Sequence, residues 1–142
     1  MSETLGVESI RDDDRAKQLI KFDGMELGER MWPTDVDALI EWKGKGWLLF
    51  EVKHGGKSVP RGQELSLERF VEDVEKAGKY AVAAIVEHHI PNPFESIILA
   101  DCDVRRIYKG WTGKWSPPKH PMTAKELMDE FVGWVNDETE GA

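Results

Sequence analysis

The sequence contains a single cysteine, Cys102, and no long uncharged apolar run. One cysteine excludes an internal disulfide and a zinc site built from cysteines, and it suits a reducing compartment. No stretch approaches the roughly 18 apolar residues that a membrane-spanning helix needs. The first residues also lack the basic and apolar regions of a signal peptide. These absences predict a cytoplasmic protein that has no membrane partner.

Basic residues are in the minority, with 19 Lys and Arg against 27 Asp and Glu and a net charge of −8. This balance argues against a protein that coats nucleic acid through bulk electrostatics. The charge is uneven, however. Lys and Arg dominate between residues 43 and 63, and a second basic cluster at 105–119 is interleaved with Tyr108, Trp111 and Trp115. Each cluster fits either solvated surface or a local nucleic-acid site. The two tryptophans would stack unpaired bases or, as we favour, belong to a hairpin tip that packs on the core or on a partner subunit.

The 142 residues, 40% of them hydrophobic, are enough for one domain with a real core. Apolar periodicity, glycines and prolines predict the following elements: a helix at 8–22, strands at 35–43 and 47–53 joined as an antiparallel hairpin, a helix from Pro60 to Gly78, an interior strand at 80–86, further strands at 96–100 and 103–108, and a final helix capped by Thr123 and Glu126. This order predicts a single α/β domain over residues 1–142, with a mixed central β-sheet flanked by helices.

Charged residues interrupt the apolar hairpin, with Asp35 and Asp37 on its first strand and Glu51 and Lys53 on its second. Strand alternation places each pair on one side of its strand. Solvated charges on edge strands are the plainer explanation, with Lys53 preventing edge-to-edge aggregation. Converging carboxylates, however, repel one another unless cations lie among them, and Lys53 with a divalent ion would supply that charge. The glycine break and long helix that follow favour a site that hydrolyses phosphodiesters.

Three segments together resemble the PD-(D/E)xK nuclease superfamily: the acidic strand PTDVDAL at 33–39, the motif Glu51-Val52-Lys53, and Gln63 early in the next helix. Small phage-type and Holliday-junction-resolvase-like members are the most similar. The resemblance covers roughly residues 31–86 and implies a restriction-endonuclease-like core there. The C-terminal strands and helix, at about 95–137, would complete the domain.

The resemblance also implies a role for each matching residue. Asp37 and Glu51 would bind Mg²⁺ or Mn²⁺, with the carbonyl of Val52 as a third ligand. Lys53 would be the catalytic lysine, and Gln63 would position substrate or water.

Further residues have supporting roles by the same resemblance. Asp35 would assist Asp37, and Glu29 or Glu26 would take the place of a first-helix glutamate. Leu67 stands where the exonuclease branch carries a tyrosine, which favours an endonuclease. His88 and His89 are expected to be surface histidines rather than metal ligands. Candidate DNA contacts surround the motif: Lys43, Lys45, His54, Lys57 and Arg61.

Three functions therefore follow from the sequence. The first is a metal-dependent, structure-selective DNA endonuclease or resolvase-like enzyme, acting as a homodimer in a bacterium or phage-infected cell. The second is a non-catalytic protein on the same scaffold that binds DNA or a protein partner. The third is an accessory nuclease that depends on a helicase or recombinase.

Overall fold

The computed structural model describes residues 23–25 and 36–140. By its internal contacts the chain divides into residues 1–33 and residues 34–142, and the fold below is that of the second unit. The helix predicted at residues 8–22 lies outside the described residues. Within the described ranges, no helix combines the length and the apolar character needed to cross a lipid bilayer.

The strands form one five-stranded mixed sheet in the order β1-β2-β3-β4-β5. β2 and β3 are parallel, and the other neighbouring pairs are antiparallel. The bounds are β1 Ala38–Trp42, β2 Gly46–His54, β3 Tyr80–His88, β4 Asp103–Lys109 and β5 Lys114–Ser116. The predicted hairpin is confirmed, with a shorter first strand, because Trp42 and Gly46 close the β1–β2 register.

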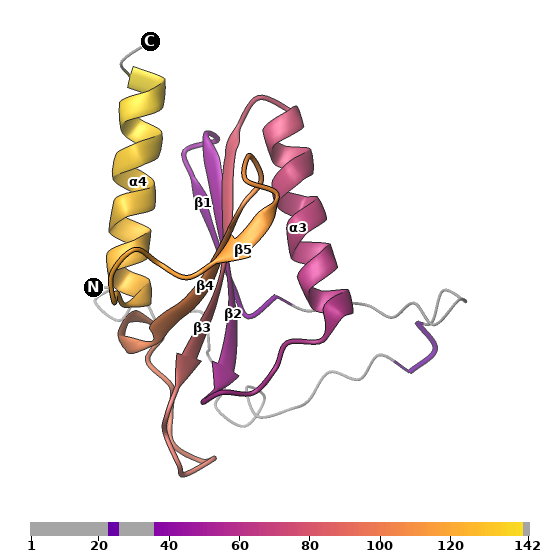
Figure 1. Ribbon diagram of the computed structural model, residues 1–142, viewed down its shortest axis with the longest axis vertical. Helices are drawn as coiled ribbons and strands as arrows, with labels where there is room; N and C mark the ends of the chain where they lie inside the picture. The colour runs from indigo at the N-terminus through magenta and orange to yellow at the C-terminus, as the bar shows by residue number, and fades with distance from the viewer. Residues whose placement is uncertain (1–22, 26–35, 141–142) are drawn as a thin grey trace, which may run out of the picture. The chain divides into compact units, whose positions relative to one another are not determined.

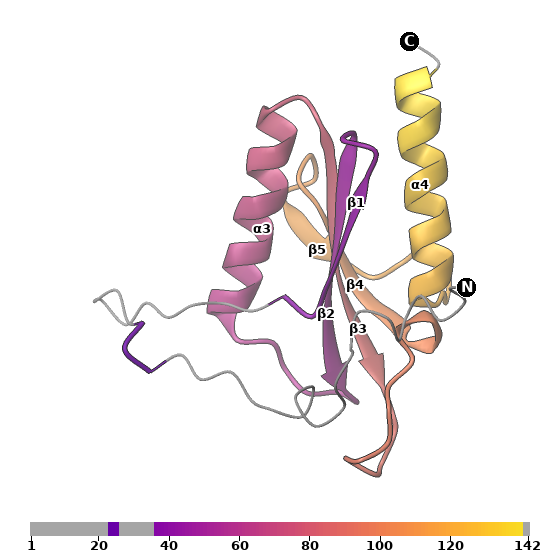
Figure 2. The same ribbon diagram turned by 180° about the vertical axis from the view of Figure 1, so that it is seen from behind.

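The two long helices cover opposite faces of this sheet, as Figures 1 and 2 show: α3, Arg61–Lys76, on one face and α4, Ala124–Glu140, on the other. Strand alternation divides the core accordingly. Leu48 and Phe50 pack in the cluster that contains Phe131 of α4, whereas Leu49 packs in the cluster that contains Val71 of α3. The predicted α/β fold, a mixed sheet flanked by helices, is therefore confirmed for this unit.

Local signals at the helix ends act as the sequence predicts. Pro60 precedes α3 in an extended conformation, and Gly78 follows it with a left-handed φ of +85°. At the start of α4, the Thr123 N–H donates to Glu126 Oε1 at 2.8 Å, and the Glu126 N–H donates to Thr123 Oγ1 at 3.2 Å. This reciprocal pair is the predicted capping box.

The strand predicted at residues 96–100 is wrong. Residues 96–98 are irregular, and Leu99–Asp101 form a short 3-10 helix, η1. Its hydrogen bonds are local, from the Asp101 N–H to the Ile98 carbonyl and from the Cys102 N–H to the Leu99 carbonyl. Ile97 and Ile98 are exposed, so this apolar run is not the buried strand that its composition suggests.

A β-bulge on β4 changes which face its residues reach. The register pairs Ile85 with Arg106 but Val86 with Val104, so Arg105 is the extra residue. Arg105 and Arg106 consequently both project toward the α3 face, where their side chains contact residues of the β2–α3 region.

Gly46 tests the packing of α4 on the sheet. A Cβ at this position would lie 3.0 Å from Phe131 Cζ and 3.0 Å from the Tyr80 carbonyl oxygen. We expect Gly46→Ala to lower the free energy of unfolding by about 1–3 kcal/mol, because neither neighbour can move without disturbing the sheet or α4. Chemical denaturation measures the change.

Gly133→Ala is the matched control, since a Cβ there meets nothing within 4 Å and the residue lies inside α4. It is expected to keep or raise the stability, by up to about 1 kcal/mol. A Gly46→Ala protein as stable as the parent would contradict the close approach of α4 to β2.

Candidate functional site

Glu51 and Lys53 lie on the α3 face near the C-terminal end of β2. They alternate with Phe50 and Val52, which belong to the α4-side cluster. Glu51 is 5% exposed and is the one charged residue in the buried core of the described chain. Burying a carboxylate is costly unless a cation or hydrogen-bond donors compensate its charge. The position therefore requires a specific electrostatic environment.

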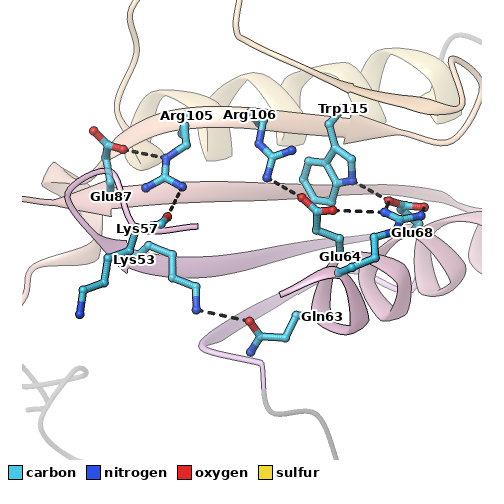
Figure 3. A network of polar contacts seen from close by, with 10 residues as sticks. Lys53, Lys57, Gln63, Glu64, Glu68, Glu87, Arg105, Arg106 and Trp115 are labelled. Atoms are coloured by element: carbon cyan, nitrogen blue, oxygen red, sulfur yellow. Dashed lines mark hydrogen bonds and ion pairs between the residues drawn. The ribbon is translucent and has the colours of Figure 1, made fainter. Parts of the chain in front are cut away.

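The ammonium of Lys53 supplies part of that environment. Its Nζ lies 3.3 Å from Glu51 Oε2 and 3.3 Å from Gln63 Oε1. Gln63 reaches it from the first turn of α3, as Figure 3 shows. Two elements that meet only in the folded chain, β2 and α3, thus hold one lysine between an anionic and a neutral oxygen.

Asp37 joins the group from the segment just before β1. The register pairs Ala38 with Phe50, so Asp37 lies at the level of Glu51. Its Oδ2 accepts the Val52 N–H at 2.8 Å, at the point where β1 stops pairing with β2. In an antiparallel pair the N–H and C=O of one residue point to the same neighbour. The Val52 carbonyl is therefore directed to the side on which Asp37 lies.

The oxygen donors of this group suit a hard cation. Mg²⁺ typically uses one or two carboxylates together with water and substrate oxygens, and Asp37, Glu51 and the Val52 carbonyl would provide such a set. In the described part of the chain, no three His, Cys, Asp or Glu side chains form a metal cluster. Asp35, Glu26 and Glu29 lie outside the described residues. The Mg²⁺ or Mn²⁺ site remains a prediction.

The structure separates the candidate DNA contacts into near and distant residues. Lys43 and Lys45 lie at the β1–β2 turn, and Lys53 comes eight positions after Lys45, which is about 26 Å along an extended strand. Lys43 Nζ lies 4.8 Å from the ring centroid of Trp42, and Lys45 pairs with Glu140 at 3.9 Å. These two lysines belong to the opposite end of the sheet and do not join the site.

The histidines also lie away from the site. His54 follows Lys53 and points to the other face, where its ring centroid is 5.0 Å from that of His88. His88 Nδ1 accepts the Ile90 N–H, and His89 Nε2 lies 3.2 Å from Glu87. Each ring thus has a local contact that accounts for its position.

Arg61 begins α3 close to the site but is already engaged. Its guanidinium donates to Glu64 at 3.2 Å and to Glu68 at 2.6 Å. The hydrogen bonds from Arg61 and from Trp115 lower the pKa of Glu68, with Arg61 the larger cause. Glu64 also receives Arg106 Nη2 at 2.6 Å (Figure 3). Lys57, in the β2–α3 loop, and Arg61 are both exposed, and they are the predicted contacts that lie near the site.

Arg105 is the site residue that sequence reasoning missed. It donates through Nη1 to the Lys57 carbonyl at 2.7 Å, through Nη2 to the Gly55 carbonyl, and through Nε to Glu87 at 2.8 Å. Three donors on one rigid fork thereby hold the β2–α3 loop, residues 55–60, against β3 and β4. In the sequence, Arg105 is marked only by its place in an arginine pair within a predicted strand, and such a pair also fits a basic surface patch.

Trp111 and Trp115 do not form a common stacking surface. Trp115 packs beside Tyr108, with ring centroids 5.4 Å apart, and its Nε1 donates to Glu68 at 2.8 Å. Trp111 contacts Trp134 of α4 instead, with centroids 5.3 Å apart, and is 57% exposed. Trp111 thus lies at the tip of the β4–β5 hairpin and packs on α4, whereas Trp115 lies in strand β5 and packs against the α3-side core.

Comparison with known proteins gives no family model, no curated protein and no solved structure that matches this chain. The resemblance stated above therefore stays a prediction that depends on the residues themselves. The geometry of Asp37, Glu51, Lys53 and Gln63 is the basis for assigning a function.

We expect Arg105→Ala to release the β2–α3 loop. The substitution removes two hydrogen bonds to backbone carbonyls and one ion pair, so the free energy of unfolding should fall by about 1–3 kcal/mol. Hydrogen exchange should show faster exchange at residues 55–60 than in the parent protein. Arg105→Lys should behave similarly, because one ammonium cannot reproduce the three directed donors of the guanidinium.

Arg69→Ala is the control for this substitution, because Arg69 is an exposed arginine of α3. Its removal should leave exchange at residues 55–60 unchanged. Equal exchange rates in the parent and in Arg105→Ala would show that the loop is held by other contacts.

Tyr108 allows a pH-dependent test of the packing between the sheet and α3, because its side chain lies in the α3-side cluster. Burial, followed by its hydrogen bond to Glu72, raises the pKa of Tyr108 to about 12. The folded state therefore favours the protonated phenol. The resulting stability is complete below the ordinary tyrosine pKa of about 10 and is lost as the pH rises toward 12.

The sequence has two tyrosines, so ultraviolet titration of Tyr80→Phe would follow Tyr108 alone. We expect a phenolate midpoint near 12 in the folded protein and a lower midpoint after Glu72→Gln. A midpoint near 10 in folded Tyr80→Phe would be inconsistent with a buried, Glu72-bonded phenol.

Proposed function

We propose that this protein is a metal-dependent deoxyribonuclease that hydrolyses phosphodiester bonds, and that it acts as a structure-selective endonuclease or resolvase-like enzyme. One observation carries the proposal: Lys53 lies 3.3 Å from both Glu51 and Gln63, and Asp37 is bonded to the intervening Val52. A buried carboxylate, a second carboxylate, a lysine and an amide thus meet at one end of the sheet.

Each residue has a chemical task in this proposal. Asp37, Glu51 and the Val52 carbonyl would hold Mg²⁺ or Mn²⁺, which would acidify a bound water and stabilise phosphate charge. The Lys53 ammonium would orient the attacking water and offset the negative charge that develops on the phosphorane oxygens. Gln63 positions Lys53 through its amide oxygen. The water would lose one proton to solvent as its oxygen bonds to phosphorus, the ester P–O bond would break, and the leaving oxygen would take a proton from a solvent water.

The surroundings of the site favour an anionic backbone as substrate. Gln63 lies in the first turn of α3, where the helix dipole favours negative charge, and Lys57 is exposed in the adjoining loop. Leu67 is 4% exposed and packs in the α3-side core, so the position that carries a tyrosine in the exonuclease branch serves packing here. This arrangement supports endonuclease action.

The cellular setting belongs to the same proposal. Buried Cys102 has a pKa raised mainly by desolvation, which suits a reduced thiol in the cytoplasm of a bacterium or phage-infected cell. Cutting both strands of a branched DNA requires two active sites, and we propose a homodimer for that purpose. A helicase or recombinase partner would deliver the substrate if the isolated chain cuts slowly.

A second function has its own supporting observation. Lys53 already compensates the charge of Glu51 at 3.3 Å, so the pair is electrostatically balanced as an ion pair alone. On this view the site is structural, and the chain binds DNA or a protein partner without cutting.

The deciding experiment incubates the full chain with labelled single-stranded, duplex, flap and four-way-junction DNA, in Mg²⁺, Mn²⁺ or EDTA. We expect cutting that EDTA abolishes. Lys53→Met and Asp37→Asn should each reduce the rate by at least about 100-fold, because the first removes positive charge at the reacting phosphate and the second removes a charged ligand of the proposed metal. Asp37→Asn keeps an oxygen that can accept the Val52 N–H, which separates the chemical role of Asp37 from its structural one.

Lys125→Ala is the matched control, since Lys125 lies on α4 and pairs with Asp129 at the surface. It should cut at the parental rate. Absence of cutting by the parent protein on every substrate, with the fold intact by circular dichroism, would overturn the nuclease proposal and favour the binding function.

A further inference from the structure

A cavity of about 390 Å³ lies on the α4 face, on the other side of the sheet from Glu51 and Lys53. It is bounded by the β4–β5 turn, the segment that follows β5, and α4. Its floor includes Val82, Ile107 and Phe131 from the α4-side core. The volume is typical of pockets that hold one small organic group. None of the candidate nuclease residues lines it.

Two tryptophans form one wall of this cavity, which we call the Trp111 cavity. Trp111 packs on Trp134, and Trp134 is held in turn by Tyr80 at 5.0 Å and Phe131 at 6.0 Å between ring centroids. Among the tryptophans that the structure describes, Trp111 alone is classed as exposed. A supported indole with one accessible side is a suitable surface for stacking a planar ring.

The charges around the cavity select the kind of ring. Lys109, Lys119 and His120 line it, against a single carboxylate from Glu130. Lys109 Nζ lies over the Trp111 ring, 5.9 Å from its centroid, so a cation is already placed at one face of the indole. The chain as a whole has a net charge of −8, whereas the residues that line this cavity carry more positive than negative charge. An aromatic surface beside two lysines is complementary to a planar group that carries a negative charge.

We propose that the Trp111 cavity binds one unpaired nucleotide of single-stranded DNA. The base stacks on Trp111, and the adjoining phosphates lie beside Lys109 and Lys119. DNA as the ligand rests on the proposed function, and the cavity extends that function by giving the enzyme a means to recognise unpaired strands in branched substrates. An apolar peptide would fill the same volume, but it would offer no negative charge to Lys109 and Lys119.

Fluorescence anisotropy of a labelled oligonucleotide of roughly ten thymidines tests the proposal, with EDTA present so that no cutting occurs. We expect Trp111→Ala to weaken binding roughly 5- to 100-fold, because one stacked base is lost. Trp111→Phe should retain part of the affinity. Lys119→Ala should reduce the salt dependence of binding by about 0.7 in log–log slope.

Phe94→Ala is the matched control, because Phe94 is a 94% exposed aromatic residue outside the cavity. Equal affinity of Trp111→Ala and the parent, equal losses in Trp111→Ala and Phe94→Ala, or no binding by the parent would each overturn the proposal. So would binding of an apolar peptide in place of the oligonucleotide. Thermal melting would confirm that each variant folds.

The result is separable from the nuclease test. Trp111-dependent binding without any cleavage would support the cavity and remove the proposed nuclease function. Lys53-dependent cleavage together with Trp111-independent binding would support the nuclease and overturn the proposed role of the cavity.

Discussion

Strand β2 is covered on both faces and paired on both edges for much of its length, and this position constrains the rest of the structure. Leu48 and Phe50 must face α4, so the alternate residues must face α3. Placing Glu51 in that second row puts a carboxylate inside the core. The fold then has to bring Lys53 and the first turn of α3 to the same point, since an uncompensated buried charge would cost several kcal/mol.

Much of the fold was predictable because its signals are local. The run YAVAAIV predicts a buried strand without reference to any other segment, and Thr123 with Glu126 marks a helix start through adjacent backbone groups. The strand wrongly predicted at residues 96–100 depends instead on non-local contacts. Ile97 and Ile98 are apolar enough for a strand, but whether they pair depends on the sheet beside them, which their own sequence does not specify.

The candidate site was predictable to the extent that it lies on one hairpin and one helix. Asp37, Glu51, Lys53 and Gln63 follow from alternation and from the short loop between β2 and α3; in the structure Lys53 contacts Glu51 and Gln63, and Asp37 contacts the backbone of Val52. Arg105 was not predictable, because its position depends on a β-bulge that changes the face its side chain reaches. Lys43 and Lys45 are close in sequence yet belong to the far end of the sheet, a separation set by the extended length of β2.

The contacts of Arg105 also bear on when the site forms. Its carbonyl partners lie 48 and 50 residues earlier in the chain, and contacts of such long sequence separation form only after the intervening loop has closed. During synthesis, β1, β2, α3 and β3 therefore emerge without the arginine that holds residues 55–60. A growing chain carries Glu51, Lys53 and Gln63 well before β4 joins the sheet. Late docking of β4 would thereby delay the ordered site until the domain is nearly complete.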